Sequence, residues 1–179
     1  MPSARGTLPW TPLSSSTHLV APAVAQATEL VPDALVAPID ATLADTEAFC
    51  AAYDVALASS ANCVVVEGRR GERTTFAAIM VLATDRADVN KTIRKALDVR
   101  KISFADQAKA EAMTGMQQGG ITPVGLPPEW RLLVDEAVVA AGPVVIGGGV
   151  RDSKLLLDGA SLARLPGAEV MALTLPREV

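Results

Sequence analysis

A cluster of glycines and one proline between Thr114 and Gly125 is the part of the sequence best suited to hold a small ligand. Four glycines and Pro123 fall within eleven positions, which predicts a shaped and stiff loop. Such a loop can present backbone N–H and C=O groups to a ligand without any catalytic side chain. A tight connection between a helix and a strand would use the same residue types, so both interpretations stay open.

A second glycine run, Gly147, Gly148 and Gly149, follows an apolar segment at residues 144–146. Successive N–H groups after a strand can bind an anion. The run is no P-loop, because no Gly-Lys-Ser/Thr follows, and its spacing differs from a dinucleotide fingerprint. Phosphate-binding (β/α)₈ barrels use a similar segment but need roughly 200 residues, and this chain has 179. A ligand-facing loop and a close approach of two backbones explain the run equally well.

Basic side chains gather on a predicted helix and just after it, at Lys91, Arg94, Lys95, Arg100 and Lys101. Residues 85–101 hold six basic and three acidic side chains, whereas the whole chain has a net charge of −4. A solvated face explains this run as well as a surface for nucleic-acid phosphates does. The chain has only six aromatic residues, which disfavours a base-stacking platform.

Other site chemistries find little support. The two cysteines, Cys50 and Cys63, and the single histidine, His18, cannot supply four ligands to zinc, so we expect no metal and no cofactor. Nothing near Cys63 would activate its thiol, and we expect it in the core. The longest uncharged stretch, residues 137–150, is too short and too rich in glycine to span a bilayer. Residues 11–18 are too polar for a secretory signal, so the protein is expected to be cytoplasmic, with no membrane partner.

The elements that must position these residues are short strands and helices without a regular βαβ repeat, which predicts the α+β class. The predicted strands are 34–39, 62–67, 75–84, 132–134, 144–146, 154–157 and 169–173. Helices are predicted from Pro22, behind a capping box at Thr42 and Asp45, over 89–97, over 105–112 up to Gly115, and over 161–165. We expect an N-terminal tail at residues 1–17 and a single domain at residues 18–179.

Several short motifs occur in one order along residues 30–173. They are Ala87-Asp88-Val89-Asn90, Lys95-Ala96-Leu97, Lys101-Ile102-Ser103-Phe104-Ala105, Thr114-Gly115, Gly119-Gly120-Ile121-Thr122-Pro123-Val124-Gly125, Val134-Asp135-Glu136 and Ile146-Gly147-Gly148-Gly149. Each motif is weak, but in this order the sequence resembles the YbaK family, also called the prolyl-tRNA synthetase-associated editing domain. The resemblance implies a single α+β domain with a mixed, partly barrel-like sheet flanked by helices.

The resemblance also implies a trans-editing hydrolase that removes a wrong amino acid from aminoacyl-tRNA. A synthetase pocket gains only ~1–3 kcal/mol per methylene, so a second, hydrolytic site is useful. The implied catalytic loop is Gly119, Gly120, Ile121, Thr122 and Pro123, which offers backbone groups to the ester. The substrate's own ribose hydroxyl is thought to help position the water, so no Ser/His/Asp set is expected.

Further roles follow from the same resemblance. The substrate would be bound by Thr114, Gly125, Asp135, Gly147, Gly148 and Gly149, and acceptor-stem phosphates by Lys91, Arg94, Lys95 and Lys101. Asp135 or Glu136 could hold the α-amino group of the substrate, although structural capping is the favoured role for at least one of these two acids. The implied partners are the aminoacyl-tRNA 3′ end and acceptor stem, with an aminoacyl-tRNA synthetase as a further candidate.

One position departs from the family pattern. Family members carry a lysine where Asn62 stands, and that lysine is taken to anchor the tRNA 3′ end or the substrate through its charge. Asparagine can donate hydrogen bonds, but neutral bonds are roughly half as strong as charge-assisted ones. The chain therefore either edits with an altered anchor or is a non-catalytic protein that binds a small molecule or an RNA end. We expect Asn62→Lys to tighten the binding of charged tRNA, and Gly120→Ala to abolish hydrolysis with the fold largely intact.

Overall fold

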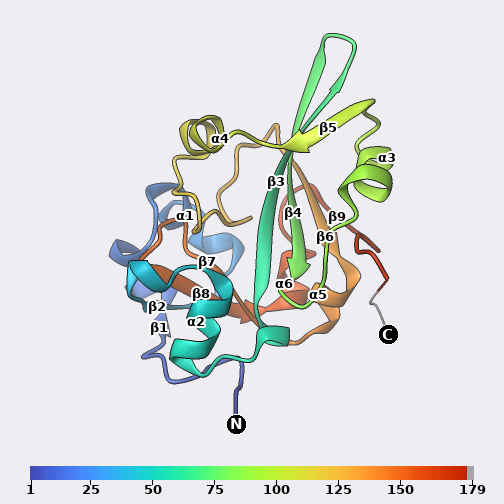
Figure 1. Ribbon diagram of the computed structural model, residues 1–179. Helices are drawn as coiled ribbons and strands as arrows, with labels where there is room; N and C mark the ends of the chain where they lie inside the picture. The colour runs from blue at the N-terminus through green and yellow to red at the C-terminus, as the bar shows by residue number, and fades with distance from the viewer. Residues whose placement is uncertain (177–179) are drawn as a thin grey trace.

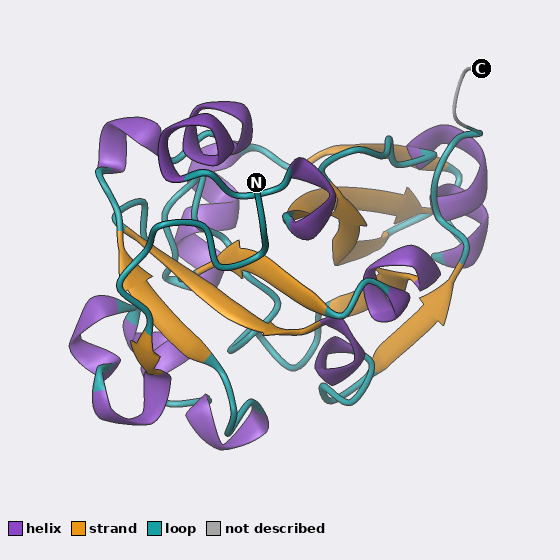
Figure 2. Cartoon of the chain, turned by 90° about the horizontal axis from the view of Figure 1, so that it is seen from below, coloured by secondary structure: helices purple, strands orange, loops and turns teal. Residues whose placement is uncertain are grey.

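The computed structural model describes residues 1–176, which form two β-sheets (Figure 1). The strand order is β1-β2-β8-β7 in the first sheet and β5-β3-β4-β6-β9 in the second. Short helices lie around the edges of both sheets (Figure 2). The predicted α+β class with flanking helices is confirmed; the strands are divided between two sheets and do not close into a barrel.

Most elements are short. The strands are β1 (Thr11–Pro12), β2 (Leu35–Pro38), β3 (Ala61–Arg70), β4 (Arg73–Leu82), β5 (Lys101–Phe104), β6 (Arg131–Asp135), β7 (Pro143–Gly147), β8 (Ser153–Asp158) and β9 (Ala168–Met171). The α-helices are α1 (Pro22–Ala25), α2 (Thr46–Tyr53), α3 (Arg94–Ala96), α4 (Gln107–Thr114), α5 (Glu136–Ala140) and α6 (Gly159–Leu162). The seven predicted strands correspond to β2, β3, β4, β6, β7, β8 and β9.

The hairpin of β3 and β4 supplies the two long inner strands of the second sheet. Its register runs from Ala61 opposite Leu82 to Arg70 opposite Arg73, and Gly71 supplies the positive φ of the tight turn. The tip of the hairpin projects beyond the rest of the sheet, with β5 beside it (Figure 1). On the other side, β4 pairs in parallel with β6, and β6 with β9. The hairpin thus links the edge strand β5 to the middle of the molecule.

Strand β4 is buried on both faces, because its alternate side chains enter different apolar clusters. Ala78 and Met80 pack in a cluster that also holds residues of the first sheet, such as Ile146. Ile79 and Val81 face the opposite side and pack in a second cluster beneath α3. A third cluster packs α2 against the outer face of the first sheet. The core is therefore continuous across both sheets.

Three local predictions differ from the structure. The helix predicted over 89–97 is a π-helical turn, Val89–Ile93, followed by the single turn α3. The Asp88 carboxylate accepts hydrogen bonds from the N–H and the hydroxyl of Thr92, which lower its pKa and widen the first turn. The capping box predicted at Thr42 and Asp45 is wrong, because Asp40 accepts from the Thr42 N–H and no side chain caps α2. The helix predicted from Pro22 is only the single turn α1.

The first seventeen residues lie on the body of the protein. Thr11 and Pro12 pair with β2, and Leu13 is fully buried in the main apolar cluster. Leu8 is buried in the cluster under α2. The buried side chains of Leu8 and Leu13 hold this segment against the protein. Its high Ser and Thr content made these few apolar positions inconspicuous in the sequence.

Candidate active site

A cavity of about 360 Å³ lies beside the place where the two sheets meet, at β3 and β7. Its volume is in the range of small-molecule sites. The lining comes from the start of α2, from β3, from the end of β5, from α4, from the glycine-rich loop and from β7 and β8. These residues are Ala44, Asp45, Thr46, Ala61, Asn62, Cys63, Val64, Val65, Phe104, Ala105, Ala110, Gln118, Gly119, Ile121, Gly147 and Lys154.

The glycine-rich loop contributes unused hydrogen-bond donors to this cavity. Gly119, with a φ of 87°, and Ile121 both line it. Neither backbone N–H donates to an acceptor within residues 1–176, whereas the Gly120 N–H donates to the Gln117 carbonyl. A cavity bordered by free N–H groups is suited to bind an oxygen atom that carries negative charge.

The two glycine segments predicted from the sequence lie against each other. The Gly149 N–H donates to the Gly120 carbonyl at 2.7 Å, and the Gln117 N–H donates to the Gly149 carbonyl at 2.9 Å. A Cβ atom on Gly147 would overlap the Gly120 carbonyl oxygen. The close approach of two backbones therefore explains this run, and of its three glycines only Gly147 lines the cavity.

Asn62 lines the cavity from β3, and one half of its amide is already bound. Its Oδ1 accepts a hydrogen bond of 2.7 Å from the Thr46 hydroxyl at the start of α2. Its NH₂ group donates to no acceptor in the described part of the chain. Because Thr46 fixes the orientation of the amide, the NH₂ group of Asn62 is left as a neutral donor at the cavity wall.

Lys154 is the residue of this site that the sequence analysis missed. It lies on β8 with 8 % of its surface exposed, and its Nζ donates to the Ala44 carbonyl at 3.2 Å. The ammonium also lies 5.2 Å from the centre of the Phe49 ring. Burial is the main cause that lowers the pKa of Lys154; Cys50 opposes this, Arg151 lowers the pKa further, and Asp45 raises it slightly. Its only sequence signal is a lone charge inside an apolar strand.

Cys63 and Phe104 line the same cavity in different surroundings. Burial raises the pKa of the Cys63 thiol to about 12, so the thiol stays protonated and is a poor nucleophile. The expectation of an inactive Cys63 agrees with this. Phe104, at the end of β5, is 70 % exposed, which is unusual for a large apolar side chain. One aromatic ring thus stands at the cavity despite the low aromatic content.

Seven other predicted site residues lie away from the cavity. Thr114 ends α4 by donating to the Ala110 carbonyl, and Thr122 is fully buried with an unpaired hydroxyl. Pro123 and Gly125 line a separate cavity of about 280 Å³, which is bordered mostly by Pro and Leu. Asp135 is buried and accepts from the N–H groups of Ala137 and Leu173, so it caps α5. The remaining two are Gly148, whose carbonyl accepts from Ala21, and Gly149.

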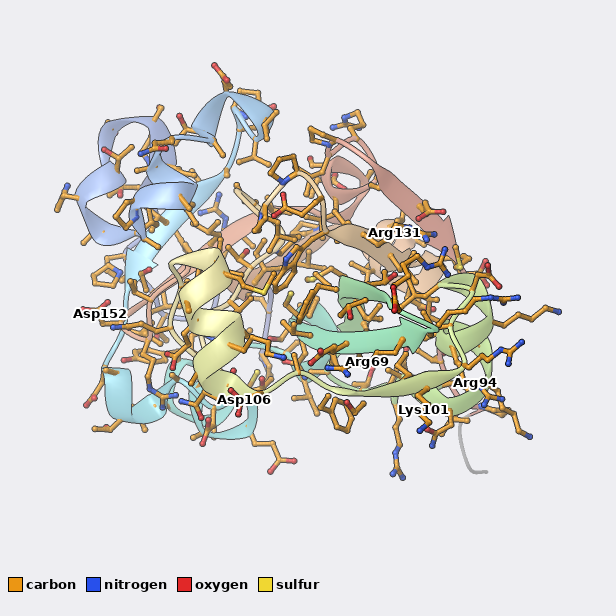
Figure 3. The ribbon with its side chains drawn as sticks, turned by 90° about the horizontal axis from the view of Figure 1, so that it is seen from above. Arg69, Arg94, Lys101, Asp106, Arg131 and Asp152 are labelled. Carbon is orange, nitrogen blue, oxygen red and sulfur yellow. The ribbon has the colours of Figure 1, made fainter. Side chains whose placement is uncertain are left out.

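The predicted basic residues border two shallow surface depressions next to α3 and β5. Lys91, Arg94, Lys95 and Arg100 border one of them, and Lys101 borders the other with Lys91, Arg94 and Arg100. Arg94 and Lys101 lie on the same side of the molecule, with Asp152 at the opposite end (Figure 3). We refer to the five basic residues, Lys91, Arg94, Lys95, Arg100 and Lys101, as the basic surface. Arg69, on β3, lies opposite Lys101 in the register of the two strands.

Strand β5 connects the basic surface to the cavity. Lys101, its first residue, borders the basic surface, and Phe104, its last, lines the cavity. Three residues of extended chain span about 10 Å, at roughly 3.3 Å per residue. The two surfaces thus lie at the two ends of one short strand.

Residues 1–176 lack two kinds of feature. No group of three side chains of the kinds that bind metals is present there. In the same residues, no helix has the length and apolarity needed to cross a membrane.

Residues 40–165 match the family model of the aminoacyl-tRNA editing domain, which covers more than half of the chain. The chain belongs to this family, and the resemblance to YbaK proteins is confirmed. Its fold is similar to that of a candidate trans-editing enzyme for prolyl-tRNA synthetase, with a TM-score of 0.74 and 20% identity over 88% of this chain and 99% of the other.

Two further solved structures share the fold. A scaffold protein used for computational grafting of linear epitopes has a TM-score of 0.73 and 22% identity, over 87% of this chain and 97% of the other. A hypothetical protein has a TM-score of 0.69 and 20% identity, over 78% of this chain and 89% of the other. At these identities the likeness shows a common fold.

Proposed function

We propose that this protein is a trans-editing hydrolase that cleaves a mischarged amino acid from aminoacyl-tRNA. The observation that carries the proposal is the pair of unused N–H groups, of Gly119 and Ile121, beside the cavity of an editing-domain chain. Ester hydrolysis needs donors for a developing oxyanion more than it needs a nucleophilic side chain.

In the proposed reaction, a water molecule adds to the ester carbonyl carbon, and the carbonyl oxygen becomes an oxyanion. The N–H groups of Gly119 and Ile121 would donate to that oxygen. The bond between the acyl carbon and the ribose oxygen then breaks, and the proton lost by the water passes to the ribose oxygen. Removing one preorganised donor costs about 10²–10³ in rate, so a site built from backbone can be an effective catalyst.

The tRNA would approach along β5. The terminal base would stack on the exposed ring of Phe104, and the phosphates behind it would meet the basic surface, beginning with Lys101. This path lets one edge strand of the sheet guide the 3′ end into the cavity. An aminoacyl-tRNA synthetase that makes the charging error is the natural further partner.

The selectivity of the site would come from the size of the cavity. Its walls include Ala44, Ala61, Ala105 and Ala110, whose small side chains leave the space open. Because one methylene in an apolar pocket is worth only ~1–3 kcal/mol, a wall built of alanines is sensitive to single larger substitutions.

The proposal is tested by incubating a panel of mischarged tRNAs with catalytic amounts of the protein and following the release of the amino acid. We expect multiple turnovers with at least one mischarged tRNA and none with the same tRNA carrying its correct amino acid. Tight binding of tRNA without turnover would favour the alternative, a non-catalytic protein that binds an RNA end. One observation supports that alternative: the neutral Asn62 stands where members of the YbaK family carry a lysine.

A further inference from the structure

Two charged side chains are buried within residues 1–176, and only one of them is satisfied. The Asp135 carboxylate accepts two backbone N–H groups, which accounts for its burial. The Lys154 ammonium has three N–H donors and one hydrogen bond, to the Ala44 carbonyl. The ammonium also lies over the face of the Phe49 ring, and the residue lines the cavity.

Nothing in the described chain neutralises this charge. Lys154 forms no salt bridge there, although Asp45 and the Cys50 thiol lie near enough to favour the ammonium. Arg151, a second cation, opposes it. Buried charges in proteins are normally paired, because an unpaired one costs several kcal/mol. Lys154 lines the cavity, which offers room for such a partner.

We propose that Lys154 is the substrate-binding cation of this cavity and that it binds an anionic oxygen of its ligand. This rests on the proposed function for the identity of that ligand, the aminoacyl-tRNA 3′ end. The aminoacyl-tRNA 3′ end can supply such an oxygen in two ways. One is the phosphate of the terminal nucleotide, and the other is the carboxylate of the amino acid after hydrolysis. Lys154 on β8 and Asn62 on β3 line the same cavity, so the cation and the neutral donor would act on one ligand from two different strands.

The test compares ligand pairs that differ only in the anionic group. AMP is compared with adenosine, and L-alanine with L-alaninamide, by NMR titration of the parent, Lys154→Met and Lys109→Met. Methionine nearly matches the length of lysine without its charge. Lys109 is the matched control, because it also lies near a phenylalanine ring, Phe76, but is exposed and pairs with Glu67 outside the cavity.

For the parent and for Lys109→Met, we expect the anionic member of at least one pair to bind roughly tenfold more tightly than its neutral partner. In Lys154→Met that preference should disappear, while the neutral partner binds as before. Loss of the AMP preference would assign the phosphate, and loss of the alanine preference would assign the carboxylate.

The proposal is overturned if the parent shows no preference in either pair, or if Lys154→Met keeps the parent's preference. Lys154→Arg, which retains the charge, should retain some preference, and thermal unfolding shows whether each variant is folded. The outcome is independent of turnover. A protein that binds AMP through Lys154 but hydrolyses no charged tRNA would refute the proposed hydrolase and leave the cation site standing.

Discussion

The Gly149 N–H donates to the Gly120 carbonyl at 2.7 Å, which joins two glycine segments that lie nearly thirty residues apart in the chain. The bond joins the glycine-rich loop to a segment behind it through two residues that do not line the cavity. Gly119 and Ile121 flank the bonded residue, so their N–H groups keep a fixed position at the cavity wall. The rigidity of the site therefore depends on a contact that the substrate would never touch.

Gly120→Ala should destabilise the protein as well as inactivate it. A Cβ atom at this position would overlap the backbone carbonyl of Val150, which cannot move without breaking the contact between the two loops. Overpacking of this kind costs typically 1–3 kcal/mol, to be measured by urea unfolding. The sequence analysis expects the fold to remain largely intact, and the structure adds a cost in stability to that expectation.

Gly115→Ala is the matched control for that substitution. Gly115 has a φ of 68° with no atom within 4 Å of an added Cβ, so only backbone strain of about 1–2 kcal/mol is expected. Deacylation by Gly115→Ala should stay near the parent rate. An unfolding free energy of Gly120→Ala equal to that of the parent would show that the two loops can separate freely.

Lys154→Met should make the protein more stable near neutral pH. Burial lowers the pKa of Lys154 in the folded state from its ordinary 10.5, so the folded state binds its proton less tightly than the unfolded chain does. The parent therefore gains stability as the pH rises from the lowered pKa towards 10.5. The advantage of the variant over the parent should be largest below that window and shrink through it. Unfolding free energies at a series of pH values measure this, and a constant difference would contradict it.

Asn62→Lys should destabilise the empty protein. The new ammonium would enter a cavity that already holds Lys154, and the substitution removes the acceptor of the Thr46 hydroxyl. The double variant Asn62→Lys with Lys154→Met moves the cation from β8 to β3. We expect the gain in affinity for charged tRNA, predicted from the sequence for the single change, to appear only in the double variant. Equal affinities of the two variants would show that the two positions do not share a ligand.

Replacing Lys91, Arg94 and Lys95 with Gln should weaken tRNA binding and flatten its salt dependence. Each lost contact with a duplex phosphate reduces the slope of log K against log salt by ~0.9. Arg5→Gln with Arg164→Gln is a control on surfaces outside the basic surface, and it should leave the slope unchanged. If the triple variant keeps the slope of the parent, the basic surface is merely solvated.

Phe104→Ala should weaken the binding of an RNA 3′ end with little change in stability. Stacking on an aromatic ring is worth ~1–3 kcal/mol per base, whereas a ring that is 70 % exposed contributes little to the core. Fluorescence titration with a short CCA-ended RNA measures the loss. Phe104→Trp keeps a stacking surface and should bind at least as well as the parent. Unchanged affinity of Phe104→Ala would remove the ring from the proposed path.

The sequence allowed all strands of the described residues except β1 and β5, and the end of α4 at Gly115, to be predicted, because apolar patterns and special backbone residues report on local structure. It could not show which residues share a cavity. Thr122, Pro123 and Asp135 belong to motifs close to the site in the chain, but their side chains face the core or another cavity. Lys154 lies in a strand that looked purely structural. Its position beside Ala44 follows only from how the two distant segments pack.

That packing has a consequence for folding. The hydrogen bond from Lys154 to Ala44 spans 110 positions in the chain, and β4 reaches β6 through a parallel pairing across some fifty residues. Contacts of such long range form late and together, so the cavity should exist only in the fully folded molecule. A ligand of the cavity would then stabilise the whole protein, by about 2.7 kcal/mol at a hundred times its Kd. The melting temperature of the intact chain is thus a direct way to search for whatever this cavity holds.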